Sequence, residues 1–154
     1  MEQKKTIKRH EAMQPLSREH HQGLLLSWKI RTGISKGVSV DRIKGYLDWY
    51  YIAHLALHFQ AEENYIFPIL GNDHELVKKA ISQHRRLERL FNSTTELRKS
   101  VSLIEEELES HIRFEERILF NEIQKIATEE QMKMVSDQHP ETKFDENTTD
   151  LFWE

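Results

Sequence analysis

The chain has 154 residues, the length of one ordinary domain, with a hydrophobic fraction of 38% and a charged fraction of 31%. Its formal net charge of −4 favours neither a nucleic-acid partner nor binding to another polyanion, and its lack of cysteine excludes disulfides, thiolate metal ligands and cysteine nucleophiles. We find no apolar run long enough to span a membrane and no signal peptide, and therefore expect a cytoplasmic protein with no membrane partner. No feature of the sequence identifies a partner protein.

Apolar residues recur at helical spacing along most of the chain, which has only five glycines and three prolines. We expect residues 1–14 to form a loosely held N-terminal arm, after which Pro15 opens the first helix. The pattern then predicts four long helices, over residues 16–34, 40–70, 75–94 and from shortly after residue 95 to about residue 127. Short turns join them, so residues 15–127 are expected to form an all-α, up-and-down four-helix bundle. On the first helix, Leu16, His20, Leu24 and Trp28 are expected to share the inner face.

The remaining residues, 128–154, are expected to form a short C-terminal extension. Thr128 and Gln131 are spaced as in a capping box, which indicates a short helix from there to about Val135. Beyond His139 the chain is acidic and irregular. The apolar residues near its end, Leu151 to Trp153, are expected to pack back on the bundle, because an exposed aromatic cluster would be costly.

Two stretches place a histidine and a glutamate four residues apart on an apolar helix face. His58 and Glu62 form the first pair, and His111 and Glu115 form the second. Buried charged groups are paired with one another or bind metals. Two helices that each present such a pair resemble two halves of one metal site, and without cysteine its ligands must be nitrogen and oxygen. Such ligands fit iron, manganese or zinc.

His20 and His84 also lie on apolar faces, and a geometric test relates them to the two pairs. Residues at one depth on consecutive helices of a bundle are equally far from the connecting turn, so their sequence midpoint falls in that turn. The midpoint of His20 and His58 is residue 39 and that of His58 and His84 is residue 71, both in turns rich in glycine, serine or asparagine. The midpoint of His84 and His111 lies a few residues past the next turn. We therefore expect all four histidines in one layer.

Several polar residues near this layer have alternative interpretations. His54 passes the midpoint test almost as well as His58, and could be a further ligand or a partner of one, while His21 could exchange with His20 if the helix is rotated. The neighbours of the two glutamates, Glu63 and Glu116, should turn away by about 100° and lie outside the site. The other histidines, at positions 10, 74 and 139, are expected at the surface. A polar network without metal is the alternative interpretation of the whole layer.

With these residues in place, the chain resembles the hemerythrin-like HHE cation-binding family of four-helix bundles. The likeness covers about residues 15–127. It rests on the motifs Leu-Ser-Arg-Glu-His-His at 16–21, His-Phe-Gln-Ala-Glu-Glu at 58–63 with Ile-Phe-Pro at 66–68, Gln-His-Arg at 83–85, and His-Ile-Arg-Phe-Glu-Glu at 111–116 with Leu-Phe at 119–120.

The resemblance implies a non-heme di-iron centre, with Glu62 and Glu115 bridging the two ions. The terminal ligands that it implies are His20, His58, His84 and His111. Respiratory hemerythrins have a second histidine four residues before the one on the third helix, where this chain has Ala80. The chain is therefore more similar to bacterial di-iron proteins linked to nitric oxide stress and iron-centre repair than to an oxygen carrier.

We accordingly expect a protein that binds or reacts with oxygen, nitric oxide or peroxide, in a stress response or in sensing. The ligand missing at Ala80 leaves room for water or a small gas. The alternative is a module that senses or stores iron without turnover. The sequence does not decide whether the protein is an enzyme.

Overall fold

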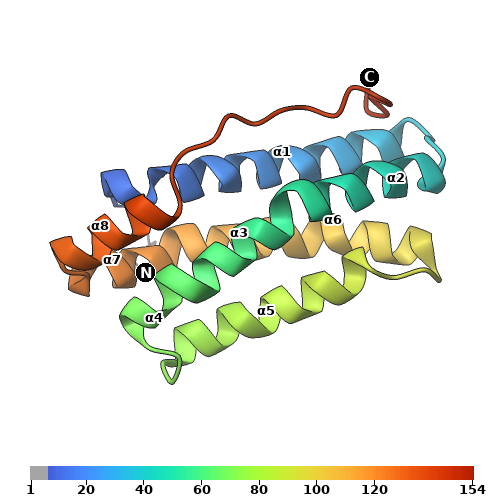
Figure 1. The fold of residues 1–154 in the computed structure, drawn as a ribbon. Coiled ribbons are helices and arrows are strands. Elements are labelled where there is room, and N and C mark those ends of the chain that lie inside the picture. Colours follow the sequence, from blue (N-terminus) through green and yellow to red (C-terminus); the bar gives the residue numbers. More distant parts are fainter. Residues whose placement is uncertain (1–6) are drawn as a thin grey trace.

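The computed structural model describes residues 7–154, and the ordered elements in this range are all helical (Figure 1). Four long rods run alternately up and down. They consist of α1 (Gln14–Ser35); α2 (Val40–Tyr50), α3 (Ala56–Ala61) and α4 (Phe67–Leu70) as one continuous rod; α5 (Glu75–Phe91); and α6 (Leu97–Phe114) with α7 (Phe120–Ile126). This is the predicted all-α, up-and-down four-helix bundle, and the predicted helix bounds hold to within three residues.

The turns that reverse the chain are short and contain the residues that such turns require. Gly37 and Gly71 have φ angles of 72° and 103°, which residues with a side chain rarely adopt. Ser39 caps α2, because its side chain accepts a hydrogen bond from the amide of Asp41. These turns set the depth of each residue on the second and third rods, and so align the polar residues in the middle of the bundle.

Three π-helical turns interrupt the second and fourth rods. They cover Tyr51–Leu55, Glu62–Ile66 and Glu115–Leu119. A π turn has i→i+5 hydrogen bonds, so the chain rotates less per residue than in an α-helix, and such turns are frequent at functional sites. Two of the three begin at the glutamates expected to bind metal.

The apolar core is divided into two clusters, one on each side of the polar layer. The upper cluster, nearer the turn between α1 and α2, includes Leu26, Ile30, Ile43, Leu47, Phe91, Ile104 and Leu108. The lower cluster, nearer the turn between α4 and α5, includes Met13, Leu16, Ile66, Phe67, Val77, Phe120 and Ile123. Both consist of fully or nearly fully buried side chains that come from all four rods.

One expectation for the first helix is wrong. Trp28 was placed on the inner face, but 47% of its surface is exposed. A stripe of strictly four-residue steps drifts by about 40° per step on a helix, so it leaves the core after three steps. The buried face alternates between steps of three and four and carries His20, Gly23, Ser27 and Ile30 instead.

The C-terminal extension begins with α8 (Glu129–Gln138), which has the predicted capping box between Thr128 and Gln131. The following segment runs back along the bundle towards the turn between α1 and α2 (Figure 1). Phe152 is fully buried near its end, where its ring lies close to Gly33 and Ile43. The expectation that the terminal apolar residues pack back on the bundle is confirmed for Phe152.

The N-terminal arm is held more firmly than expected over the residues that the structure describes. Ala12 and Met13 are buried. Arg9 donates hydrogen bonds to Gln124 and to Glu116, and only 7% of its side chain is exposed. Residues 1–6 of the expected arm lie outside the described residues. Between residues 7 and 154, no helix combines the length and the apolar character needed to cross a membrane.

Candidate metal centre

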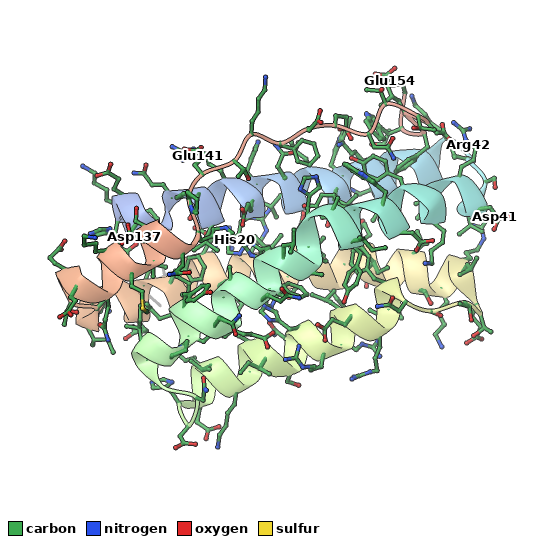
Figure 2. All side chains as sticks on the ribbon, in the orientation of Figure 1. His20, Asp41, Arg42, Asp137, Glu141 and Glu154 are labelled. Carbon is green, nitrogen blue, oxygen red and sulfur yellow. The ribbon has the colours of Figure 1, made fainter. Side chains whose placement is uncertain are left out.

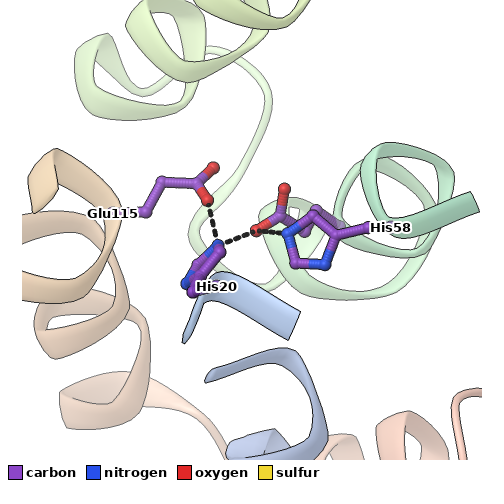
Figure 3. A group of neighbouring side chains, drawn as sticks. His20, His58 and Glu115 are labelled. Carbon is purple, nitrogen blue, oxygen red and sulfur yellow. Dashed lines mark hydrogen bonds and ion pairs between the residues drawn. The ribbon is translucent and has the colours of Figure 1, made fainter. Parts of the chain in front are cut away.

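Six buried side chains meet in the layer between the two apolar clusters, and they are the six predicted from the sequence. They are His20 from α1, His58 from α3, His84 from α5, His111 from α6, and Glu62 and Glu115 from the starts of two π turns. None of the six is more than 5% exposed. Figure 2 shows His20 in the interior of the bundle, and Figure 3 shows His20, His58 and Glu115 pointing towards one another from different rods.

The first four donors form one compact group. His20 Nε2 lies 2.8 Å from Glu115 Oε1 and 3.3 Å from Glu62 Oε2, and His58 Nε2 lies 3.1 Å from the same Glu62 oxygen. One ligand atom from each of these four residues lies within 4.8 Å of the other three. The group has the size and chemistry of a metal position with two imidazole and two carboxylate donors.

The second group uses the other histidines and the same two glutamates. His84 Nε2 lies 3.1 Å from Glu62 Oε1 and 3.4 Å from Glu115 Oε2, and His111 Nε2 lies 3.1 Å from that same Glu115 oxygen. Each glutamate therefore offers one oxygen to each group. Carboxylates placed in this way could bridge two ions, which is the role that the resemblance implies for Glu62 and Glu115.

The inner atoms of this layer are mostly left without hydrogen bonds. Among the described residues, the Nε2 atoms of His58, His84 and His111, both oxygens of Glu62 and Glu115 Oε2 are buried and have no hydrogen-bond partner. Leaving one such group unsatisfied costs about 1–3 kcal/mol, and native structures rarely leave several in one place. Lone pairs that converge without partners are what bound cations require, so the donor set fits a pair of metal ions.

In each of the four histidines of the layer, the outer nitrogen, Nδ1, forms a hydrogen bond with a residue that lies next to a proposed ligand on another rod. The pairs are His20 with Glu116, His58 with Glu19, His84 with Glu63 and His111 with Gln83, at 2.5, 2.6, 2.7 and 2.6 Å. Each Nδ1–H donates to the carboxylate or amide oxygen, which leaves Nε2 as a lone-pair donor facing the centre. Such outer partners fix the orientation of the imidazole ring and make it a better ligand.

This outer shell corrects two expectations and adds two residues. Glu63 and Glu116 were expected to turn away from the site, but each contacts a histidine of the layer. The expectation took the direction away from the inner face to lead to solvent, whereas in the bundle it leads to a histidine of the adjacent rod, as it also does for Glu19 and Gln83 on regular α-helices. Glu19 and Gln83 were not singled out from the sequence; their position directly before a proposed ligand is the signal that could have found them.

His139 is also not the surface residue that was expected. Its Nε2 lies 2.9 Å from Glu19 Oε2, and its side chain is only 19% exposed. Glu19 therefore contacts both His58 in the layer and His139 in the C-terminal extension. Burial raises the pKa of Glu19, but the hydrogen bonds to His139 and His58 outweigh it and lower the pKa to about 2.

The electrostatics of the layer bring charges of opposite sign together. Burial lowers the pKa of His58, but the charge of Glu62 and the hydrogen bond to Glu19 raise it to about 9. Burial also lowers the pKa of His20 and His84, but the carboxylates around them, first of all Glu115, raise both well above the usual value. For Glu62, the nearby histidines outweigh burial and the charge of Glu115, and its pKa falls to about 2. In the absence of metal, these shifts favour the protonated forms of His20, His58 and His84.

The other two histidines near the layer are outside it. His21 is exposed, and neither His21 nor His54 belongs to the two donor groups. His54 packs against Trp49 and Phe144, and its Nε2 is buried without a hydrogen-bond partner in the described part of the chain. Ala80, at the position where respiratory hemerythrins have a further histidine, is fully buried.

A cavity of about 620 Å³ adjoins the layer. Its lining includes three of the proposed ligands, His20, His58 and His111. The rest of the lining combines apolar residues such as Leu55 and Ile112 with polar ones such as Arg18 and His54, and residues 138–144 of the C-terminal extension form part of its wall. The cavity therefore extends from the C-terminal extension to the layer.

Comparison with known families agrees with this geometry. The model of the hemerythrin HHE cation binding domain matches residues 10–123, which contain all six residues of the layer. The comparisons with curated proteins and with solved structures gave no match.

Proposed function

Because the chain belongs to the hemerythrin HHE cation-binding family, and its buried layer marks it as a metal-binding protein, we propose that it holds a non-heme di-iron centre which binds or reacts with oxygen, nitric oxide or peroxide. The observation that carries the proposal is the layer itself, with two donor groups that share the two carboxylates. The proposed ligands are His20, His58, His84 and His111, with Glu62 and Glu115 as bridges.

Iron is proposed on the family resemblance, because the donor set by itself also fits zinc. Each group offers two nitrogen and two oxygen donors, and the sequence has no cysteine. Four ligands would satisfy zinc in a structural site, whereas an ion that takes more than four ligands would keep a position open. Ala80 adds no donor, which leaves such a position free. The same donors are also compatible with manganese.

The residues around the layer would prepare the site for a small ligand. Two iron ions, when bound, would supply one-electron chemistry towards diatomic molecules and peroxide. Glu62 and Glu115 would balance the charge of the ions, while the outer partners keep the histidine rings in orientation. Phe59, stacked on His84 at 3.8 Å between ring centroids, and Phe120 beside His20 keep water away from the donors. The cavity along His58 and His111 would admit the ligand.

The test is the metal content of protein purified without oxygen and without a histidine tag, followed by optical spectra before and after exposure to air. We expect about two irons per chain and a spectrum that changes in air or with nitric oxide. Protein that contains no stoichiometric metal, even after reconstitution with ferrous iron, would contradict the proposal and leave a helical bundle with a buried polar network. Fast ligand-dependent oxidation with turnover would indicate an enzyme, and freely exchanging iron without turnover a sensor or store.

A further inference from the structure

The four outer hydrogen bonds of the layer are not equivalent. Three histidines donate Nδ1–H to a carboxylate, but His111 donates to the neutral amide oxygen of Gln83 at 2.6 Å. A hydrogen bond to an ionised acceptor is roughly twice as strong as one to a neutral acceptor. A carboxylate partner also draws the ring proton towards itself, which makes the imidazole a stronger electron donor to a metal. His111 is therefore expected to be the weakest of the four nitrogen ligands.

This difference divides the two metal positions. In the first, both histidines have carboxylate partners, Glu116 for His20 and Glu19 for His58. In the second, His84 has a carboxylate partner, Glu63, but His111 has only the neutral amide of Gln83. The bridging residues do not change the balance, since each glutamate offers one oxygen to each position.

The basic groups behind the outer carboxylates do not remove the contrast. Arg9 lies 3.1 Å from Glu116, His139 lies 2.9 Å from Glu19, and Arg85 forms a hydrogen bond with Glu63 at 3.1 Å. All three carboxylates thus have such a partner, and each keeps a formal negative charge that Gln83 lacks. The second position therefore has one outer negative charge fewer than the first.

We infer that the two metal positions have unequal affinity, that the first ion occupies the position of His20 and His58, and that Gln83 makes the position of His84 and His111 the weaker and more readily exchanged one. The inference rests on the proposed function. Gln83 acts through His111 and is a positioning residue. Loss of such an outer partner typically changes metal affinity by 10- to 100-fold, so we expect a difference of about tenfold from this cause.

Two stepwise binding constants alone would not test this. Repulsion between two cations weakens the second binding step even when the positions are identical. The measurement must therefore show which histidines bind first. Side-chain nitrogen NMR spectra of the metal-free protein, titrated with Zn²⁺ as a diamagnetic probe, resolve the four histidines individually. At one equivalent we expect the signals of His20 and His58 to shift, and those of His84 and His111 to shift only as the second equivalent is added.

The substitution Gln83→Glu supplies the missing charge. In this variant the first equivalent of Zn²⁺ should divide between the two positions, and the second ion should bind about tenfold more tightly. Ser82→Glu is the matched control, because it adds the same charge to an exposed position on the same helix and should leave the filling order unchanged. Gln83→Ala should weaken metal binding at the second position further. If Gln83 had a purely structural role, a loss of affinity in Gln83→Ala would not be accompanied by a gain of affinity in Gln83→Glu.

The outcomes separate this inference from the function on which it rests. If all four histidines shift together at one equivalent in the unchanged protein, or if Gln83→Glu behaves like Ser82→Glu, the inequality is refuted while the metal centre stands. If no histidine signal shifts at two equivalents, the metal centre itself is refuted, and the inference with it. Circular dichroism of each metal-free variant verifies that it is folded.

Discussion

The apolar clusters and the polar layer between them are both buried, but they are organised by opposite rules. In the clusters each side chain is in contact with others of its kind, so burial stabilises the fold directly. In the layer, nitrogen and oxygen atoms face one another, several of them without hydrogen bonds, so its burial depends on protons or cations between them. The clusters therefore hold the bundle together and impose the geometry of the layer. Folding and metal binding should therefore be separable by mutation.

The largest effect is expected from removing a shared carboxylate. Glu115→Ala takes a donor from both positions, so the variant should retain less than one metal ion per chain and lose the stabilisation that metal provides. For each ion, that stabilisation is about 4 kcal/mol when the free metal is a thousand times the Kd. Thermal unfolding with and without Fe²⁺ or Zn²⁺ measures it. Glu106→Ala, at an exposed position on the same helix, should behave like the unchanged protein. Equal metal content in both variants would contradict the assignment of the site.

A substitution that creates a cavity in an apolar cluster should lower stability without changing the metal content. Leu47 is fully buried in the upper cluster, and Leu47→Ala should lower the free energy of unfolding by roughly 2–5 kcal/mol. The loss should be similar with and without metal, and the metal content per chain should stay the same. Denaturant unfolding together with metal analysis tests both parts. A variant that loses its metal while remaining folded would show that the cluster and the layer are not separable.

The pH dependence of stability should differ between metal-free and metal-loaded protein. The pKa of His58 is about 9 in the fold against an ordinary 6.5, so its protonated form stabilises the metal-free protein fully below pH 6.5, and this contribution is lost as the pH rises through 9. The loss between pH 6.5 and pH 9 is on the order of 2–3 kcal/mol. Glu62, with a pKa of about 2, contributes stability above pH 4.5 that is lost on acidification towards pH 2.

Bound metal should reverse the alkaline part of this dependence. Ions displace the protons of the histidines, so metal affinity rises with pH and offsets the loss. Melting temperatures between pH 6 and pH 9 should therefore fall for the metal-free protein and remain steady or rise for the loaded protein. Parallel curves for the two forms would indicate that metal does not bind where the protons are.

The smallest effect is expected at the edge of the bundle, where the C-terminal extension is attached. Glu146 accepts hydrogen bonds from Lys29 at 2.7 Å and Tyr46 at 2.5 Å, and Lys29 is buried. Glu146→Gln leaves that ammonium group without its counter-charge and should cost about 1 kcal/mol. Metal content should not change. Glu141→Gln, in a largely exposed ion pair with Arg18, is the control and should have almost no effect.

The sequence was sufficient to predict the rods and the inner layer, because both follow from regular spacing. Steps of three and four residues place apolar side chains on one face, and the midpoints of histidine pairs locate the layer by the symmetry of an up-and-down bundle. The error at Trp28 arose where a strict four-residue step replaced this alternation. The short C-terminal helix was found from the capping box at Thr128, which is a local signal.

The outer shell of the site was not predicted, because it depends on contacts between rods. Glu63 and Glu116 lie next to a glutamate of the layer, and only the placement of the adjacent rod shows that a histidine lies beside each of them. His139 lies after the last helix, in a segment without any period from which its position could be read. The pairing of Gln83 with His111 became visible only when the rods were placed side by side.

The outer hydrogen bonds also specify the hand of the bundle. The outer hydrogen bonds form a closed cycle around the bundle. On each rod, the residue next to a proposed ligand is the hydrogen-bond partner of the histidine on the following rod, and the fourth rod supplies the partner for the first. A bundle that turned the other way would keep the same neighbours and could bury the same apolar faces. It would, however, direct Glu19 away from His58, and likewise the other three partners away from their histidines. The layer thus acts against the mirror-image topology that an up-and-down bundle must exclude.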